Sequence, residues 1–423
     1  MSLGLIVFLI CFFFNLIIGF PIAFNLIFSS IIYLILGGYP ISIAVQRIFC
    51  ASSLISLLTI PFFVLMGQIL LRGGVLKLLV NFVNAFVGHI KGALAIVAVL
   101  TCLFMGAIVG LAVAEAASLG SLLIPIMKKE RYSPAFSAAV MTAASLLGPI
   151  MPPSVLMIMY AVAVGRTSVA GLFAAAVVPA FLIAFAQIFV ILRRSKIENY
   201  PSYSKVDWPH KLDAFKKAIP VLLLPVFLLG LIFGKVCSVN EAAFLGSLYA
   251  LVITFKKLQM KDYIEILKET AVTSGLIILL VAAGTITSWV IVNERVVYML
   301  TNSLTQLPAW LFLLLLNVFL LINGMFMDDG ASAIVWGPII APIAWALGID
   351  PLQIGAIVCI NLVIGLSTPP FGIVLFVTGP IAGVRIEDIF VEELPLIGVT
   401  IGVLLLVTYI PSLTLFLPRL LGY

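Results

Sequence analysis

Charged residues are scarce in this sequence, and their scarcity excludes an ordinary soluble protein. They make up 9% of the 423 residues, while 63% are apolar; a soluble domain carries about a quarter charged residues. The two histidines, His89 and His210, stand far apart, so neither a zinc site nor a catalytic triad can be assembled. The GxxxxGK[ST] motif is absent, so the chain does not itself hydrolyse ATP. We therefore expect a membrane protein that is not an enzyme.

Cysteines are also few, and none belongs to a CxxC pair. The five stand singly in or near apolar segments: Cys11, Cys50, Cys102, Cys237 and Cys359. Isolated cysteines in such surroundings are typical of small buried hydrophobic residues. The sequence therefore predicts no redox centre, no zinc site and no bound cofactor.

Long apolar runs occupy much of the chain. They cover 3–18, 22–36, 54–71, 170–192, 221–233, 275–292 and 394–416. Most approach the roughly 20 residues that a helix needs to cross a bilayer, and they are too continuous for β-barrel strands. The first run follows Met1 and Ser2 without a basic flank or a cleavage site, which predicts a retained helix rather than a signal peptide. The predicted fold class is an all-α polytopic membrane protein.

The basic residues predict how the chain is oriented. Seven lie in a central linker, 193–217: Arg193, Arg194, Lys196, Lys205, Lys211, Lys216 and Lys217. Because positively charged connections stay in the cytoplasm, this linker is expected there. Tracing outward from it places 18 of the 23 basic residues on the same side, gives five crossings in each half and leaves both termini periplasmic. The segments 207–217 and 256–270 are expected to be amphipathic and to lie at the cytoplasmic interface.

The chain contains an internal repeat. Sliding the sequence on itself by 217 residues pairs 114–173 with 331–390 without a gap, and 11 of the 60 paired positions are identical. Four identities are prolines: Pro125, Pro134, Pro152 and Pro153 fall on Pro342, Pro351, Pro369 and Pro370. An odd number of crossings per half makes the second copy enter from the opposite face, as in the inverted repeats of secondary transporters. The alternative is a chance match of two membrane stretches rich in proline and glycine.

Each copy is predicted to contain a re-entrant helical hairpin followed by a helix that prolines break. The first copy spans 1–192, with its hairpin at 93–128 and its broken helix at 134–165. The second copy spans 218–423, with its hairpin at 311–347 and its broken helix at 351–383. The two returning helices are expected to begin at Glu115 and Ala331. This plan predicts an alternating-access site near the centre.

The proline breaks point to cation binding. A Pro-Pro pair frees backbone carbonyls, and irregular backbone at membrane depth is tolerated only inside protein or beside a hydrated cavity. Such carbonyls, with Ser, Thr or Asn oxygens, suit a hard cation such as sodium; a simple packed kink is the alternative. The predicted first site joins 110–118 to Ser145, Gly148 and Pro149, and the second joins 324–332 to Asn361, Gly365, Ser367 and Thr368.

Three acidic residues were expected deep in the apolar stretches: Glu115, Asp328 and Asp329. Intramembrane ionisable groups are functional candidates because their burial is costly. The two aspartates are predicted cation ligands or cavity residues, and the alternative for all three is capping of the returning helix. Helix N-termini near positions 115, 154, 331 and 371 would direct partial positive charge to the centre, which suits an anionic solute. Ser154 is the best single hydroxyl for a solute carboxylate.

Two long stretches resemble a known family. GAIVGLAVAEAASLGSLLIPIMKKERYSPAFSAAVMTAASLLGPIMPPS and GMFMDDGASAIVWGPIIAPIAWALGIDPLQIGAIVCINLVIGLSTPPFG are similar to the large membrane subunit of tripartite ATP-independent periplasmic (TRAP) transporters. The similarity extends over essentially the whole chain, ending in YIPSLTLFLPRLL. It implies an elevator mechanism in the bacterial inner membrane, in which both hairpins and both broken helices slide against a scaffold.

The resemblance also implies partners and cargo. The partners are a small four-helix membrane subunit and a periplasmic substrate-binding protein, with no nucleic acid. Uptake is driven by inward sodium flow, and sodium is the coupling ion rather than a cofactor. The substrates are organic acids, including C4-dicarboxylates, sialic acid and other sugar acids.

Carried onto this sequence by position, the resemblance places sodium and solute at the hairpin tips and the breaks. The sodium set is Gly110, Ser118, Ser145, Gly148, Pro149, Gly324, Asp328, Ser332, Asn361, Gly365, Ser367 and Thr368. The solute set is Glu115, Pro153, Ser154, Asp329 and Pro370. The chain departs from many relatives at Gly110-Leu111-Ala112, which offers no hydroxyl beside the glycine of the first hairpin.

Two other functions stay open at this point. A self-sufficient sodium:carboxylate symporter could share the inverted hairpins and would need no binding protein. A non-transporting membrane scaffold is the other, and two polar breaks at membrane depth argue against it because they are costly.

Overall fold

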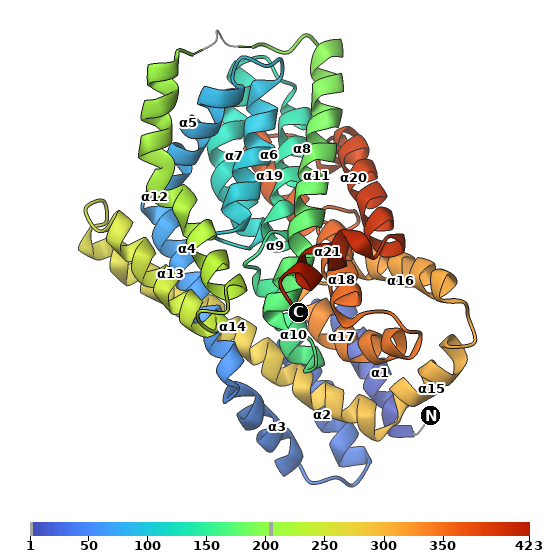
Figure 1. Cartoon of the computed structure of the whole chain (residues 1–423). Helices are drawn as coiled ribbons and strands as arrows, with labels where there is room; N and C mark the ends of the chain where they lie inside the picture. The colour runs from blue at the N-terminus through green and yellow to red at the C-terminus, as the bar shows by residue number, and fades with distance from the viewer. Residues whose placement is uncertain (1–2, 203–205) are drawn as a thin grey trace.

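The computed structural model describes residues 3–202 and 206–423, and this part of the chain is helical with no strand (Figure 1). Met1, Ser2 and Lys205 lie outside the described residues. The first half contains α1 (Leu3–Ile17), α2 (Ile22–Leu36), α3 (Ser42–Ser52), the 3-10 helix η1 (Ile55–Leu58), α4 (Thr59–Arg72), α5 (Val75–Val87), α6 (Ala93–Gly106), α7 (Ala112–Lys129), α8 (Pro134–Ser145), α9 (Leu147–Ile150), α10 (Val155–Val164) and α11 (Val169–Ile197). The second half contains α12 (Trp208–Phe233), α13 (Val239–Thr254), α14 (Met260–Asn293), α15 (Val296–Leu304), α16 (Ala309–Gly324), α17 (Asp329–Ala346), α18 (Pro351–Gly365), α19 (Ile373–Ala382), α20 (Ile386–Tyr409) and α21 (Ser412–Leu420).

The helix boundaries follow the 217-residue spacing over more of the chain than the sequence identities do. Adding 217 to the bounds of α7 gives 329–346, which are the bounds of α17. Adding 217 to the first residues of α8 and α11 gives 351 and 386, the first residues of α18 and α20. Adding 217 to the first residue of α2 gives 239, the first residue of α13. One difference is clear: α3 and α4 are separate helices, whereas the equivalent stretch of the second half is the single helix α14.

Capping residues explain why two of the matched helices begin where they do. Ser133 caps α8 by accepting a hydrogen bond from the Phe136 backbone N–H at 3.4 Å. Asp350 caps α18 by accepting one from the Leu352 backbone N–H at 2.8 Å. Proline follows each cap at the first helical position, where its missing N–H costs nothing. These caps fix the residue at which each broken helix begins.

Several helices are long and apolar enough to span a membrane. Within the described ranges five qualify by length and composition: Ile55–Arg72, Val169–Ile197, Trp208–Phe233, Met260–Asn293 and Ile386–Tyr409. The pair Pro134–Ile150 and Val155–Val164, bent by 46°, makes a sixth. The ten membrane crossings expected from the sequence, five in each half, stay a prediction. The apolar run 394–416 is divided between two helices, because α20 ends at Tyr409 before Pro411 and α21 follows separately. The segment 260–270 is the first part of the continuous helix α14.

Packing divides the helices into two sets. We call α1–α5 with α12–α15 the frame: α4 packs on α13 and α14, α2 packs on α1 and α14, and α5 packs on α12. We call α6–α11 with α16–α21 the hairpin body, in which α8 packs on α6, α7 and α20, and α18 packs on α16 and α17. The two sets meet chiefly where α14 and α15 contact α17, where α10 contacts α14, and where α5 contacts α6.

The two broken helices exchange their second segments inside the hairpin body. The segment α10, from the first half, packs on α17 and α18 of the second half, while α19 packs on α7 and α8 of the first half. The Thr142 and Thr378 hydroxyls join α8 to α19 at 2.7 Å. Each hairpin is therefore flanked by a segment of the other half.

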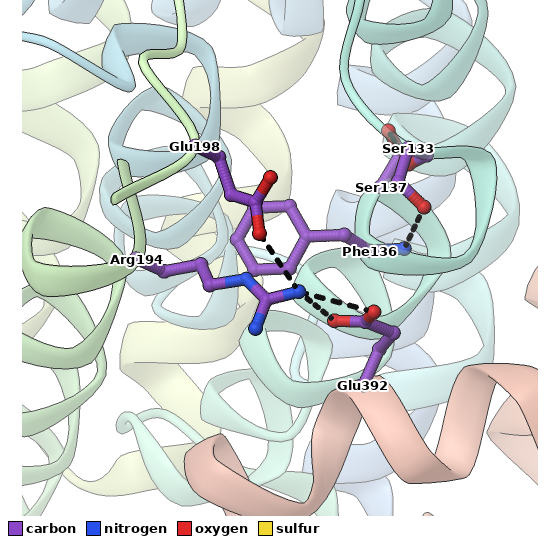
Figure 2. Close-up of polar contacts among 6 residues, drawn as sticks. All are labelled: Ser133, Phe136, Ser137, Arg194, Glu198 and Glu392. Atoms are coloured by element: carbon purple, nitrogen blue, oxygen red, sulfur yellow. Dashed lines mark hydrogen bonds and ion pairs between the residues drawn. The ribbon is translucent and has the colours of Figure 1, made fainter. Parts of the chain in front are cut away.

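Polar contacts tie the two halves together near the central linker. Figure 2 shows Arg194 of α11 reaching Glu392 of α20, with N–O distances of 3.1 and 3.2 Å, and Glu198 at 3.4 Å. The Tyr200 ring stacks on the Tyr132 ring with centroids 4.2 Å apart, and burial there raises the pKa of the Tyr200 phenol. The beginning of the linker is therefore packed against the end of the first hairpin.

Candidate functional site

The first hairpin turns between Gly106, the last residue of α6, and Ala112, the first of α7. The returning helix was expected to begin at Glu115, and it begins three residues earlier. Leu111 holds the N-cap position and makes no side-chain cap, so the capping alternative for Glu115 is wrong. Gly110 has a φ of +67°, a conformation that favours glycine, and this lets the chain turn there.

The tip of this hairpin lies directly against the break of the first broken helix. A Cβ on Gly110 would lie 3.1 Å from the Pro153 carbonyl oxygen, and a Cβ on Gly106 would lie 2.9 Å from the Leu147 carbonyl oxygen. Residues 151–154 form the break and are buried, and the Pro152-Pro153 bond is cis. Backbone carbonyls and the hairpin tip therefore meet inside the protein.

Glu115 points into this junction. It is 0% exposed, and neither carboxylate oxygen has a hydrogen-bond partner. A Cβ on Gly148 would lie 2.8 Å from the Glu115 carboxylate, so the carboxylate rests on the backbone of the broken helix. An unpaired buried carboxylate costs several kcal/mol unless a cation or proton neutralises it. The structure thus brings together Glu115 and Gly148, which were predicted for different roles.

The serines predicted around this junction donate their protons to backbone carbonyls. Ser118 donates to Ala114 O at 2.6 Å, and Ser145 donates to Thr142 O at 2.8 Å. Ser154 is buried; it donates to Pro149 O at 2.5 Å and accepts from Met157 N–H at 3.3 Å as the cap of α10. A hydroxyl that donates in this way keeps lone pairs that can accept or bind a cation.

The second hairpin makes an equivalent contact with the second break. A Cβ on Gly324, at the end of α16, would lie 2.9 Å from the Gly365 Cα, at the end of α18. The Pro369-Pro370 bond is cis, as in the first break. Unlike Pro153, Pro370 is exposed. The breaks therefore differ in burial while their hairpin contacts match.

Asp328 and Asp329 lie at the tip of the second hairpin. Asp328 caps α17, because its carboxylate accepts from Gly330 N–H at 3.1 Å and from Ala331 N–H at 3.4 Å. The capping role of Asp328 is confirmed, and α17 begins at Asp329 rather than at Ala331. Asp329 accepts from Gly330 N–H at 2.8 Å. Two adjacent carboxylates thus share the start of one buried helix.

Several oxygens around the second break are buried without a hydrogen-bond partner. They are Asn323 Oδ1, Ser332 Oγ and Asn361 Oδ1. The amide of Asn361 is held by its nitrogen, which donates to Asn317 Oδ1 at 2.7 Å, and this leaves the oxygen unused. Ser367 and Thr368 donate to Ile364 O at 3.2 and 3.0 Å. Unpaired buried oxygens are rare in native proteins, and a bound ion is one of the few explanations.

A second fully buried carboxylate is not among the residues predicted from the sequence. Glu393 of α20 is 0% exposed, and both of its oxygens lack a hydrogen-bond partner. Its carboxylate faces the Ser367 hydroxyl in the second break. The signal was present, because the buried stripe Ile389, Glu393, Leu396, Ile397 and Thr400 has helical spacing.

A cavity of about 280 Å³ opens between the hairpin tips and the frame. The hairpin tips contribute Gly110 and Leu111 from the first and 328–330 from the second. The remaining walls are apolar side chains of α10 and α14, together with Thr273. Ser154 and Glu115 are not among its lining residues, although Val155 and Asp329 are. The cavity is the place where both halves of the hairpin body face α14.

The donors fit a hard cation better than a transition metal. Within the described part of the chain no three His, Cys, Asp or Glu residues cluster as a metal site. The available donors are carboxylate, amide, hydroxyl and carbonyl oxygens, the ligands of hard cations. None of the four carboxylates, of Glu115, Asp328, Asp329 and Glu393, takes part in an ion pair among the described residues. A small cation would supply the missing positive charge.

These features define a polytopic membrane protein with a transporter fold. The YdaH transporter of Alcanivorax borkumensis has a similar structure, with a TM-score of 0.59 over 89% of this chain and 87% of that chain, at 16% identity. The sequence matches the model of the tripartite ATP-independent periplasmic transporter, DctM component, over residues 9–413. The chain belongs to this family as a large membrane subunit of a TRAP transporter, and it is a permease rather than an enzyme.

Similar permeases include transporters of C4-dicarboxylates and of sialic acid. The C4-dicarboxylate TRAP transporter large permease protein DctM of Pseudomonas aeruginosa is 36% identical over 381 residues, covering 89% of each chain. The sialic acid TRAP transporter large permease protein SiaM of Vibrio cholerae is 34% identical over 413 residues, covering 96% of each chain. The family is therefore matched along nearly the full length of the protein.

Proposed function

We propose that this chain takes up an organic acid by sodium-coupled secondary transport, with one sodium site at each junction between a hairpin tip and a proline break. The single observation that carries this proposal is the set of unpaired buried oxygens at those junctions. The first junction has the Glu115 carboxylate on Gly148. The second has Ser332, Asn361 and the Glu393 carboxylate on the helices that form or flank the break.

Charge balance supports sodium as the coupling ion. Each junction holds a buried carboxylate without a basic partner, and an uncompensated charge in the membrane is costly. Sodium bound by carbonyls of unwound helix and by side-chain oxygens would offset that cost. We therefore assign Glu115 to the cation rather than to the solute. The matched hairpin contacts at Gly148 and Gly365 argue for one ion at each junction.

The cavity between the hairpin tips and α14 is the proposed solute site. It is lined by both hairpins, so a solute there would contact both halves of the molecule at once. Asp329 would bind hydroxyl or amide groups of a sugar acid, or would reach a dicarboxylate through a cation. C4-dicarboxylates and sialic acid are the leading solute classes, because the two relatives are named as transporters of these acids.

The repeat supports an elevator mechanism. Helix boundaries repeat at 217 residues, and the odd number of crossings expected per half makes the repeat inverted. The hairpin body would move as a unit because α10 and α19 each pack on the opposite hairpin. The frame would stay fixed, with the basic linker in the cytoplasm and both chain ends in the periplasm. A small membrane subunit would bind the frame, and a periplasmic binding protein would deliver the solute.

Reconstitution tests this function. The chain, its small membrane subunit and its loaded binding protein are placed in proteoliposomes, and uptake of radiolabelled succinate and N-acetylneuraminate is measured. Uptake should require an inward sodium gradient and should stop when potassium replaces sodium outside. Uptake of either solute without any sodium gradient would reject sodium coupling.

Uptake by the same vesicles without the binding protein distinguishes the proposed function from a second candidate. A self-sufficient sodium:carboxylate symporter would take up free solute when the binding protein is left out. A TRAP transporter should show no uptake until the binding protein is added.

A further inference from the structure

Two cavities lie along one face of α14. The first is the solute cavity at the hairpin tips, and the second, of about 230 Å³, lies farther along the helix. On α14 the first is lined by 273, 276, 277 and 280, and the second by 281, 284, 285, 288, 289 and 292. Steps of three and four residues put the positions of the first cavity on one stripe of the helix and those of the second on a neighbouring stripe, and the two stripes adjoin at 280 and 284. Figure 1 shows α14 running diagonally, with α3 on one side and α10 and α17 on the other.

The opposite wall is continuous too. On α10 the first cavity is lined by Val155, Leu156 and Met159, and the second by Val162 and Ala163. On α17 residues 329 and 330 line the first cavity, and residues 334 and 338 line the second. The two cavities are therefore two parts of one crevice between the frame and the hairpin body.

A single contact narrows this crevice between its two parts. A Cβ on Gly284 would overlap the Cγ2 methyl of Ile334, so the backbone of α14 touches the side chain of α17 there. Only glycine at 284 permits this approach. Separation of the frame from the hairpin body at this contact would join the two cavities.

The far end of the crevice carries donors for an anion. Arg47 of α3 lines the second cavity together with Thr285, Ser288 and Trp289. Its guanidinium makes no ion pair or hydrogen bond among the described residues, while its backbone carbonyl accepts from the Thr285 hydroxyl at 3.3 Å. No carboxylate lines this cavity. The Thr285 proton is directed to the Ala282 and Arg47 carbonyls, which leaves the Arg47 guanidinium and the Ser288 hydroxyl as the groups that can donate to a carboxylate.

We propose that Arg47 is the outer recognition residue of the carrier, which binds the carboxylate of the arriving organic acid before it moves along α14 to the hairpin tips. This inference rests on the proposed function, and on the orientation that puts α3 on the periplasmic side, opposite the linker (Figure 1). An anionic lipid headgroup offers the same chemistry. The test therefore has to separate solute from lipid.

The first measurement needs no knowledge of the solute. In a background with the five cysteines replaced, Ser288→Cys is labelled with an anionic methanethiosulfonate that carries a sulfonate and with its cationic trimethylammonium counterpart. Arg47→Gln should lower the anionic-to-cationic rate ratio about tenfold. The matched control Arg295→Asn removes an exposed charge that lines neither cavity, and it should leave the ratio unchanged. An unchanged ratio in Arg47→Gln would overturn the proposal.

The second measurement is uptake of succinate and N-acetylneuraminate in vesicles of pure phosphatidylcholine and in vesicles containing phosphatidylglycerol. Arg47→Gln should raise the solute KM about tenfold in both lipids, and Arg47→Lys should recover part of it. An effect confined to phosphatidylglycerol vesicles would assign Arg47 to lipid and reject the proposal. If the unmodified protein transports nothing, the proposed function fails, while the labelling ratio still decides whether Arg47 makes an anion site.

Discussion

At the scale of residues, the groups proposed to bind sodium are buried oxygens that secondary structure leaves unpaired. Sequence alone could predict Glu115, Asp328 and Asp329, because acidic residues are conspicuous in apolar runs. Glu393 was hidden, because it follows Glu392 in a stretch that resembles the charged end of a helix. The two neighbours point apart: Glu392 pairs with Arg194, and Glu393 is buried facing Ser367. The helical spacing of Ile389, Glu393, Leu396 and Ile397 is the one sequence signal that separates the two, and it is easily masked by the charged neighbours of Glu393.

Replacement of Glu115 by Gln tests the first proposed sodium site. The amide keeps the shape of the side chain and removes its charge, so sodium should bind less tightly. The sodium concentration for half-maximal uptake should rise about tenfold or more. Glu130→Gln, at the other end of the same helix, is the control. An unchanged sodium dependence in Glu115→Gln would exclude the carboxylate as a ligand.

Glu393→Gln tests the second site in the same assay, with its neighbour as a matched control. We expect Glu393→Gln to weaken the sodium dependence of uptake. Glu392→Gln removes a partly exposed ion pair with Arg194 and should cost at most about 1 kcal/mol of stability, with the sodium dependence unchanged. Equal behaviour of the two variants would contradict a role for Glu393.

At the scale of elements, helix ends could be predicted from the sequence, because glycine and proline mark where helices must stop; the re-entrant course of the hairpins stays a prediction. The hairpin bounds 93–128 and 311–347 lie within two residues of α6–α7 and α16–α17. Which segment packs on which could not be predicted: α10 lies on α17 and α19 on α7, partners far apart in sequence. Ser154 illustrates the limit, since its hydroxyl caps α10 and bonds to Pro149.

The contact between α14 and α17 gives a prediction about moving elements. Gly284→Ala should strongly reduce uptake, because the added methyl overlaps Ile334 and wedges the two helices apart. Ile334→Ala in the same protein should restore most of the uptake, because it removes the overlapping atom. Uptake is measured per inserted protein, with Ile334→Ala alone as the control. Failure of the second change to rescue the first would show that the overlap is not the cause.

At the scale of the whole molecule, the proposed elevator mechanism requires the hairpin body to move against the frame. Positions 284 and 334 can test this, because a Cβ on Gly284 would lie 3.5 Å from the Ile334 Cβ, within the range of a disulfide. In a cysteine-free background, Gly284→Cys with Ile334→Cys should cross-link under oxidation and stop uptake, and reduction should restore it. Thr142→Cys with Thr378→Cys, both inside the hairpin body, should cross-link without stopping uptake. Full uptake by the cross-linked 284–334 pair would contradict relative motion at this contact.

The central claim is that the two hairpin–break junctions bind sodium, and equilibrium binding of ²²Na⁺ to the purified protein in lipid nanodiscs tests it most directly. We expect saturable binding that excess sodium displaces and excess potassium does not. We also expect Glu115→Gln and Thr368→Ala each to remove part of the binding capacity, and the combined variant to remove nearly all of it. Binding that is not saturable, or that the combined variant retains in full, would contradict the account.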